Sequence, residues 1–339
     1  MNDPLRVAVV GAGGWGQQHA RVFAQRQDTD LVAIVGRDHD RTSAHAERWG
    51  TRGYTDLHGM LDAERPDLVT ISLPNEHHFA TTLEIIRSGT PLFVEKPLVF
   101  DLDEADALLR EAAERDLFFG IDFNHRFAEP VQRAKAAVDA DELGRVVFAT
   151  WRFGGSANYG TSRHANLIET QCHGFDLLEH LVGPITSVMA QMTDVTYGDW
   201  STLALALEFE GGPVGTMLGT YDSSYAYPDS QLIEINGVGG RAVIHDTVRE
   251  LELSRADHPE TRVWRAGYFD DEARSFHRTF DRHVDAVLAA FRDGRQPPVH
   301  ARDGRRALEL AHAAVVSHET GTRIATTRRD VDPLPRNER

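Results

Sequence analysis

The sequence of 339 residues contains a single cysteine, Cys172. One thiol cannot form an intrachain disulfide or a metal site built from several cysteines, so a reducing compartment is the simplest fit. The sequence also lacks a run of about eighteen apolar residues, the length that a membrane helix needs. No signal-peptide pattern precedes the first strand-like segment. We therefore expect a cytoplasmic protein without a membrane partner.

Positive charge is also in short supply. Lys and Arg total 36 against 52 Asp and Glu, which gives a formal net charge of −16. This balance excludes a general affinity for nucleic acid or for anionic membranes. The content of 41% hydrophobic and 26% charged residues is that of an ordinary globular protein. The length predicts about two domains.

Short apolar runs alternate with helical patterns through the first third of the chain. The runs cover residues 5–11, 30–37, 67–74, 91–97 and 117–124. Helical segments of roughly 10–15 residues between such runs are typical of βαβ units and a parallel sheet. We therefore predict an α/β protein whose N-terminal Rossmann domain, over residues 1–123, binds a dinucleotide.

A different pattern begins at residue 124. One helix is expected near 129–140, followed by strand-like segments joined by Gly-rich turns. This pattern predicts a C-terminal α+β domain over 124–339 with a large, mostly antiparallel, open sheet. Its tail, about 326–339, is expected to be poorly ordered. Because several strands carry apolar residues on both sides, we expect a homodimer or homotetramer through this sheet.

The first strand-like run leads into the sequence GAGGWG. Gly11, Gly13 and Gly16 form a G-x-G-x-x-G motif between a strand and a helix. Such glycines allow a tight turn, close approach of the backbone to a pyrophosphate, and close packing of the helix on the strand. The start of the helix adds free N–H groups and a partial positive charge. We expect this loop, with Trp15, to bind the cofactor.

The end of the second strand bears on the choice between NAD and NADP. An acidic residue that binds the ribose is expected here, but the sequence has Gly36, Arg37 and Asp38. A small residue leaves room for a 2′-phosphate, and the arginine that follows offers a cation to bind it. Asp38 keeps NAD possible if its carboxylate reaches the ribose, and Arg37 has the alternative of a solvated surface charge. NADP is the preferred cofactor on this reading.

Three further motifs complete a set with the glycine loop: Leu73-Pro74-Asn75 with His78, Glu95-Lys96-Pro97, and Glu169 with His173. Together they resemble the Gfo/Idh/MocA oxidoreductase family, over about residues 5–325. The resemblance implies that Leu73, Pro74, Asn75 and His78 contact the cofactor.

The same resemblance implies roles for Glu95 and Lys96. Lys96 would act in catalysis at the carboxyl end of a strand, reaching across the nicotinamide to a substrate hydroxyl. Glu95 would lie near the nicotinamide ribose or hold Lys96. The peptide bond before Pro97 is often cis in this family. Without the resemblance, an exposed strand end would explain the Glu95-Lys96 pair equally well.

Glu169 and His173 are four residues apart, a spacing that places two side chains on one face of a helix. By resemblance His173 is the proton acceptor, in a motif that usually has Asp where this chain has Glu169. That difference argues against copying a substrate from the inositol dehydrogenases. Asp176 is expected to orient His173 or to serve packing in the same helix.

Other candidates for substrate binding lie near the expected domain junction. They are Asn124, His125, Arg126, Trp151, Arg152 and Tyr159. Each of them is as well explained by packing or by a salt bridge. Glu169 and His173 have the spacing of metal ligands, but no third ligand stands at a persuasive offset, so no metal is expected.

The sequence therefore predicts reversible oxidation of a secondary hydroxyl on a sugar, a sugar derivative or a cyclitol, with NADP or NAD as hydride acceptor. Two alternatives remain open: an NAD-dependent glycosidase of the same fold, and a dinucleotide-binding regulator without enzymatic activity. A regulator would have no need for proton-transfer groups such as Lys96 and His173.

Overall fold

The structure is a computed structural model that describes residues 3–155, 162–195 and 199–326. It divides the chain into two compact units. Unit 1 comprises Met1–Phe123 and Phe280–Arg305, and unit 2 comprises Asn124–Thr279 and Arg306–Arg339. The sequence predicted an uninterrupted second domain from residue 124. The structure instead groups 280–305 with the first unit, because one helix of that segment packs on the first sheet. The expected tail lies almost entirely outside the described residues.

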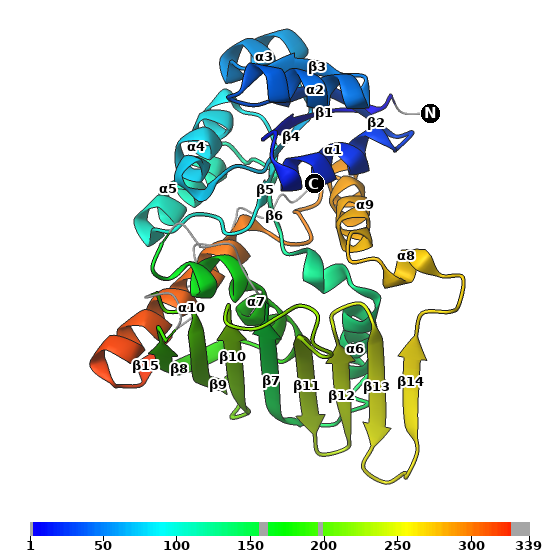
Figure 1. Cartoon of the computed structure of the whole chain (residues 1–339), viewed down its shortest axis with the longest axis vertical. Helices are drawn as coiled ribbons and strands as arrows, with labels where there is room; N and C mark the ends of the chain where they lie inside the picture. Colours follow the sequence, from blue (N-terminus) through cyan, green and yellow to red (C-terminus); the bar gives the residue numbers. More distant parts are fainter. Residues whose placement is uncertain (1–2, 156–161, 196–198, 327–339) are drawn as a thin grey trace. The chain divides into compact units, whose positions relative to one another are not determined.

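Unit 1 is built on a parallel sheet of six strands in the order β3-β2-β1-β4-β5-β6 (Figure 1). The strands are β1 (Leu5–Val10), β2 (Thr29–Val35), β3 (Arg52–Tyr54), β4 (Leu68–Ile71), β5 (Leu92–Glu95) and β6 (Phe119–Asp122). The helices between them are α1 (Gly14–Ala24), α2 (His39–Trp49), α3 (Leu57–Glu64), α4 (His78–Ser88) and α5 (Leu102–Ala113). The central strands are buried on both faces, as a sheet covered by helices requires. The strand order reverses next to β1, where such sheets bind ligands.

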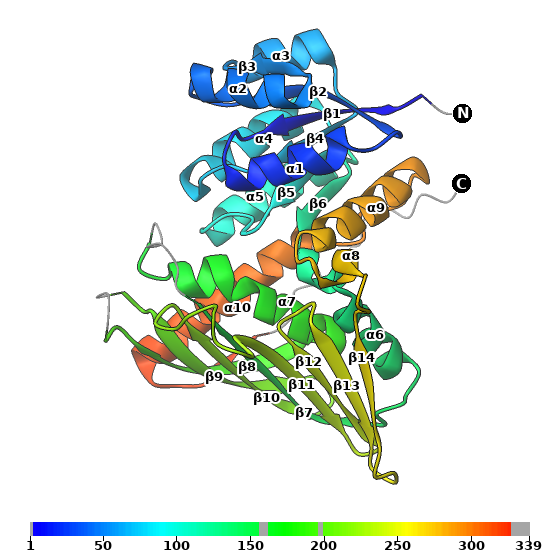
Figure 2. The same cartoon turned by 45° about the vertical axis from the view of Figure 1, so that its right-hand side comes forward.

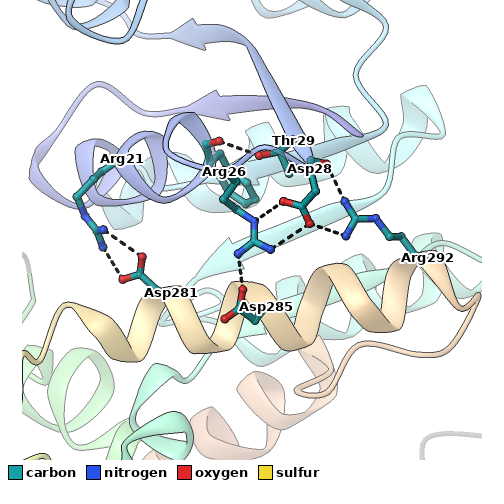
Figure 3. Close-up of polar contacts among 8 residues, drawn as sticks. Arg21, Arg26, Asp28, Thr29, Asp281, Asp285 and Arg292 are labelled. Atoms are coloured by element: carbon teal, nitrogen blue, oxygen red, sulfur yellow. Dashed lines mark hydrogen bonds and ion pairs between the residues drawn. The ribbon is translucent and has the colours of Figure 1, made fainter. Parts of the chain in front are cut away.

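Helix α9 (Arg278–Arg292) follows β6 by about 160 residues in sequence, yet most of it belongs to unit 1. Ion pairs join it to the end of α1 and the start of β2 (Figure 3). Arg21 donates two hydrogen bonds to Asp281, at 3.1 and 2.8 Å. Asp28 accepts from both Arg26 and Arg292. These two cations lower the pKa of Asp28 to about 2 against the effect of its partial burial.

Unit 2 contains an open sheet of nine strands in the order β14-β13-β12-β11-β7-β10-β9-β8-β15. Its strands are β7 (Val146–Gly154), β8 (Ile185–Thr193), β9 (Thr202–Phe209), β10 (Val214–Thr220), β11 (Gln231–Gly237), β12 (Gly240–His245), β13 (Glu250–Arg255), β14 (Thr261–Arg265) and β15 (Ile324–Ala325). Among the strands described in this sheet, only β7 and β10 pair in parallel, and the other pairs are antiparallel. The predicted fold class is confirmed in both parts.

The helices of unit 2 are α6 (Glu129–Asp139), α7 (Cys172–Leu181), α8 (Asp271–Arg274) and most of α10 (Ala301–Thr320). Helix α7 packs on β7, and α6 packs on β12 and β13 (Figure 2). Along β9 and β10 buried and exposed residues alternate, since successive side chains of a strand point to opposite faces. The face turned away from the buried side exposes Met189, Val214 and Leu218. No helix in the described part of the chain is long and apolar enough to cross a membrane.

Candidate functional site

The glycine loop lies between β1 and α1, as the motif predicted. Gly11 has φ of +132°, and a Cβ there would lie 1.9 Å from the carbonyl oxygen of Ser72. A Cβ on Gly16 would lie 1.9 Å from the carbonyl oxygen of Gly11. Glycine is therefore required at both positions, once for the turn and once for the contact between helix and strand.

The first turn of α1 provides the expected anion site. Gly13 is the N-cap of the helix, and no side chain bonds to the N–H groups of this end. A Cβ on Gly13 would meet nothing within 4 Å, so the backbone is open to a ligand there. Free N–H groups at a helix N-terminus fit the pyrophosphate of a dinucleotide. Trp15 is 47% exposed beside this turn and stacks on Phe280, with ring centroids 5.5 Å apart.

The end of β2 resolves what each of the three predicted residues contacts. A Cβ on Gly36 would lie 2.4 Å from Thr42 Oγ1 and 2.8 Å from Ala12 Cβ, so this position does not accept a larger residue without rearrangement. The Asp38 carboxylate caps α2 by accepting the backbone N–H of Arg41 at 2.8 Å. Arg37 reaches the loop after β4, where its Nη1 lies 2.7 Å from His77 Nε2. His77 occupies a variable position of the Pro-Asn-x-x-His motif, so the motif itself gives no signal for it.

The loop after β4 carries the Pro-Asn-x-x-His motif, and its histidine is buried. His78 Nε2 lies 2.9 Å from the carbonyl oxygen of Leu73, and Nδ1 lies 3.3 Å from that of Leu98. Burial lowers the pKa of His78, against the opposing effect of these two carbonyls. The ring thus lies between the loop after β4 and the loop after β5, and a neutral imidazole donates to one of the two carbonyls. His78 therefore supports the loops from within, while Pro74 and Asn75 begin a short 3₁₀ turn.

Lys96 directly follows β5, and the bond between Lys96 and Pro97 is cis. The Lys96 backbone N–H donates to Glu95 Oε2 at 3.1 Å. Glu95 itself is 6% exposed, and its Oε1 lies 3.0 Å from His19 Nε2 of α1. Burial would raise the pKa of Glu95, but His19 and Lys96 together lower it below its usual value. Glu95 is therefore an ionised carboxylate inside unit 1.

Glu169 and His173 do not lie on one continuous α-helix, although their spacing predicted it. Glu169 belongs to a single π-helical turn, Asn166–Thr170, and α7 begins at Cys172. Single π-turns are common at functional sites, because the wider turn shifts the side chains that follow. His173 is only 6% exposed in the first turn of α7.

His173 stacks on a second imidazole, that of His125. The two rings are nearly parallel, at 7°, with centroids 3.9 Å apart. His125 Nδ1 lies 3.2 Å from Gln231 Nε2 on β11. Arg126 donates to both carboxylate oxygens of Asp176, at 2.8 and 2.5 Å. The predicted residues His125, Arg126, His173 and Asp176 thus form one group within unit 2.

The remaining residues predicted to bind substrate do not form one group in the structure. Trp151 is buried and donates to Gln171 Oε1 at 2.8 Å, while a Cβ on Gly174 would lie 2.6 Å from its Nε1. Arg152 is the next residue of β7, is exposed, and therefore points to the other face of the sheet. Trp151 and Arg152 cannot both face one ligand. Asn124 is buried and donates to Thr279, and Tyr159 lies outside the described residues.

Unit 1 has the strand order and the glycine loop of a Rossmann-type dinucleotide-binding protein, and a lysine directly follows its fifth strand. The chain belongs to the Gfo/Idh/MocA oxidoreductase family. Residues 5–123 match the family's NAD-binding Rossmann fold, and residues 135–326 match its C-terminal alpha/beta domain. The family resemblance and the prediction of an oxidoreductase are thereby confirmed.

Two relatives and one solved structure show the range of the similarity. Myo-inositol 2-dehydrogenase of Thermotoga maritima is 26% identical over 327 residues, covering 93% of this chain and 96% of the relative. D-glucoside 3-dehydrogenase of Escherichia coli is 28% identical over 228 residues, covering 61% and 65%. An NAD binding oxidoreductase from Klebsiella pneumoniae shares the fold with a TM-score of 0.87 at 16% identity, covering 96% and 100%.

Proposed function

We propose that this protein oxidises, reversibly, a secondary hydroxyl of a sugar, a sugar derivative or a cyclitol by hydride transfer to NADP or NAD. The proposal rests on one observation above all: this member of an oxidoreductase family has Lys96 directly after β5 and His173 in the first turn of α7. The names of the two relatives, an inositol and a glucoside dehydrogenase, support a polyhydroxylated ring as substrate. They also favour net oxidation over the glycosidase and regulator alternatives.

The nicotinamide supplies the hydride chemistry when it is bound. The chain binds the pyrophosphate at the N–H groups of α1 and supplies the proton-transfer groups. In this proposal His173 accepts the proton of the substrate hydroxyl, and its stacking on His125 holds the ring in one orientation. Lys96 stabilises negative charge that develops on a substrate oxygen. Glu169 binds substrate hydroxyls or adjusts the orientation of His173.

The preference for NADP is the finer part of the proposal. Gly36 offers no carboxylate to repel a 2′-phosphate, and Thr42 and Ala12 leave no room for one. The carboxylate of Asp38 is engaged by the N-terminus of α2. The Arg37 guanidinium contacts an imidazole, that of His77, and remains a cation able to hold a phosphate. These contacts support NADP as a cofactor at least as good as NAD.

The test is a screen of sugars, cyclitols and sugar phosphates with each cofactor, following reduced nicotinamide. On the best substrate we expect Lys96→Met and His173→Asn to lower kcat by about two orders of magnitude or more. His180→Asn serves as the matched control. It lies on the same helix, α7, where burial, with nearby Arg126 and Lys135, lowers the pKa of His180 to about 3. Turnover near the wild-type value in Lys96→Met would remove the role assigned to this lysine.

We also propose a homodimer or homotetramer formed through the sheet of unit 2. The support is the group of exposed apolar residues on one face, Met189, Val214 and Leu218. Light scattering at micromolar concentration measures the mass directly. A monomer there would contradict the assembly.

A further inference from the structure

Four titratable side chains meet in the interior of unit 1, and the proposed reaction uses none of them directly. They are His19 of α1, Glu95 of β5, Asp122 of β6 and His283 of α9, each at most 6% exposed. His19 Nε2 lies 3.0 Å from Glu95 Oε1 and 3.7 Å from Asp122 Oδ2. Asp122 Oδ1 lies 2.7 Å from His283 Nδ1. We call these four residues the buried quartet.

The surroundings of the quartet hold it in one arrangement. His19 Nδ1 lies 3.1 Å from Thr70 Oγ1 of β4, so both ring nitrogens have polar partners. The rings of Phe93 and Phe280 lie against His19, and Phe93 also lies against His283, with centroids 5.0–6.0 Å apart. Aromatic walls of this kind exclude water, which strengthens each hydrogen bond and makes any unpaired charge costly.

The charges of the quartet follow from its burial and from its partners. Burial would lower the pKa of His19, but the bond to Glu95 and the charges of Glu95 and Asp122 raise it above its usual value. Burial and the charge of Glu95 raise the pKa of Asp122 well above the normal range. The His19 imidazole thus faces the Glu95 carboxylate, and Asp122 shares a hydrogen bond with His283 Nδ1.

The quartet is connected to Lys96 through Glu95. The second oxygen of Glu95 accepts the Lys96 N–H, and the charge of Lys96 acts on Glu95 and on Asp122. Two buried carboxylates are expensive to retain, and a packed apolar core of the same volume is often at least as stable. Because stability alone does not explain such a cluster, its place beside the proposed catalytic lysine suggests that it orients this lysine.

We propose that His19, Asp122 and His283 are positioning residues for Lys96: they fix the Glu95 carboxylate, which in turn fixes the backbone and the electrostatic surroundings of the lysine. The inference rests on the proposed function, because it assigns these residues to the step in which Lys96 takes part. The proposal also gives α9 a function. His283 lies on this helix, about 160 residues after β6 in sequence, and supplies the fourth member of the quartet.

A double-mutant cycle tests the proposal on the intact chain. His19→Phe keeps the ring volume and removes both polar atoms, and Lys96→Met removes the group that is being positioned. We expect His19→Phe to lower kcat about tenfold or more in the wild-type background, because small displacements of a catalytic group are costly. In the Lys96→Met background the same change should alter kcat by less than about threefold. KM for the substrate and Kd for NADPH, measured by fluorescence, should change little.

Two further variants separate positioning from folding. His19→Gln restores a donor near Nε2 and is expected to recover most of kcat. His45→Phe is the matched control, a half-buried histidine of α2 that contacts Gln17. We expect it to leave kcat unchanged in both backgrounds.

Three results would overturn the proposal. The first is an equal loss of kcat from His19→Phe in both backgrounds, because the effect would then not pass through Lys96. The second is a loss of NADPH binding that parallels the loss of kcat. The third is a stoichiometric divalent metal in the purified protein, since His19, Glu95 and Asp122 also have the donor atoms of a metal site. Failure of the proposed function gives a different result, full turnover in Lys96→Met alone.

Discussion

His300 makes the start of α10 sensitive to acid. The residue immediately precedes the helix, and its Nδ1 accepts the backbone N–H of Arg302 at 3.1 Å, as an N-cap side chain does. An imidazole can accept this bond only while Nδ1 carries no proton. Burial, followed by the charge of Arg302, lowers the pKa of His300 to about 4. The positive end of the helix dipole disfavours the imidazolium in the same direction.

The sign of the effect on stability follows from proton binding. In the unfolded chain the imidazole has an ordinary pKa near 6.5, so between pH 6.5 and 4 the unfolded chain binds more protons than the folded one. Stability from this group is complete above pH 6.5 and falls as the solution becomes more acidic. From pH 8 to pH 5.5 the loss is about 1.4 kcal/mol of unfolding free energy. That figure depends on the unfolded pKa, because the folded ring stays neutral at pH 5.5.

The assay compares the wild type with His300→Asn by urea unfolding at pH 8 and at pH 5.5. The amide oxygen of asparagine accepts the same N–H and does not titrate, so the variant should gain about 1.4 kcal/mol on the wild type at the lower pH. His258→Asn is the control, because exposed His258 also accepts a backbone N–H two residues later, from Glu260 at 3.3 Å. Equal pH dependence of wild type and His300→Asn would refute the reasoning.

Three further predictions concern unit 1. Arg37→Ala should raise the Kd for NADP about tenfold to a hundredfold and the Kd for NAD less than about threefold, because a charge-assisted hydrogen bond is worth about 1.5–3 kcal/mol. Fluorescence titration measures both values, and equal effects on the two cofactors would contradict the prediction. Gly16→Ala should destabilise unit 1 by about 3 kcal/mol in thermal unfolding, because the new Cβ would lie 1.9 Å from a backbone oxygen. Gly14→Ala, with nothing within 4 Å of its Cβ, should not lower Tm, and equal losses would show that the steric argument fails. Asp281→Asn should cost about 1 kcal/mol by loss of the paired bonds to Arg21; an unchanged urea midpoint would mean that this ion pair does not help to hold α9.

The patterns that the sequence predicted correctly are local. The alternation of strands and helices and the glycine motif of the first loop are properties of short segments, so they can be recognised without knowledge of distant parts of the chain. Gly11 illustrates this, because its positive φ follows from the turn alone. Asp38 shows where such reasoning ends. Its carboxylate had two possible roles in sequence, and only the direction of α2 decided that it caps the helix.

The sequence by itself determined the fold class, the dinucleotide motif, and the presence of Lys96 and His173 as candidate proton-transfer groups. Only the tertiary structure decided which residues support them. His283 reaches Asp122 from α9, His77 reaches Arg37 across two loops, and Gln231 reaches His125 from β11. The partners in these pairs are 161, 40 and 106 residues apart in sequence. No periodicity or motif spans such separations, because the contacts arise from the packing of whole helices and strands rather than from local conformation.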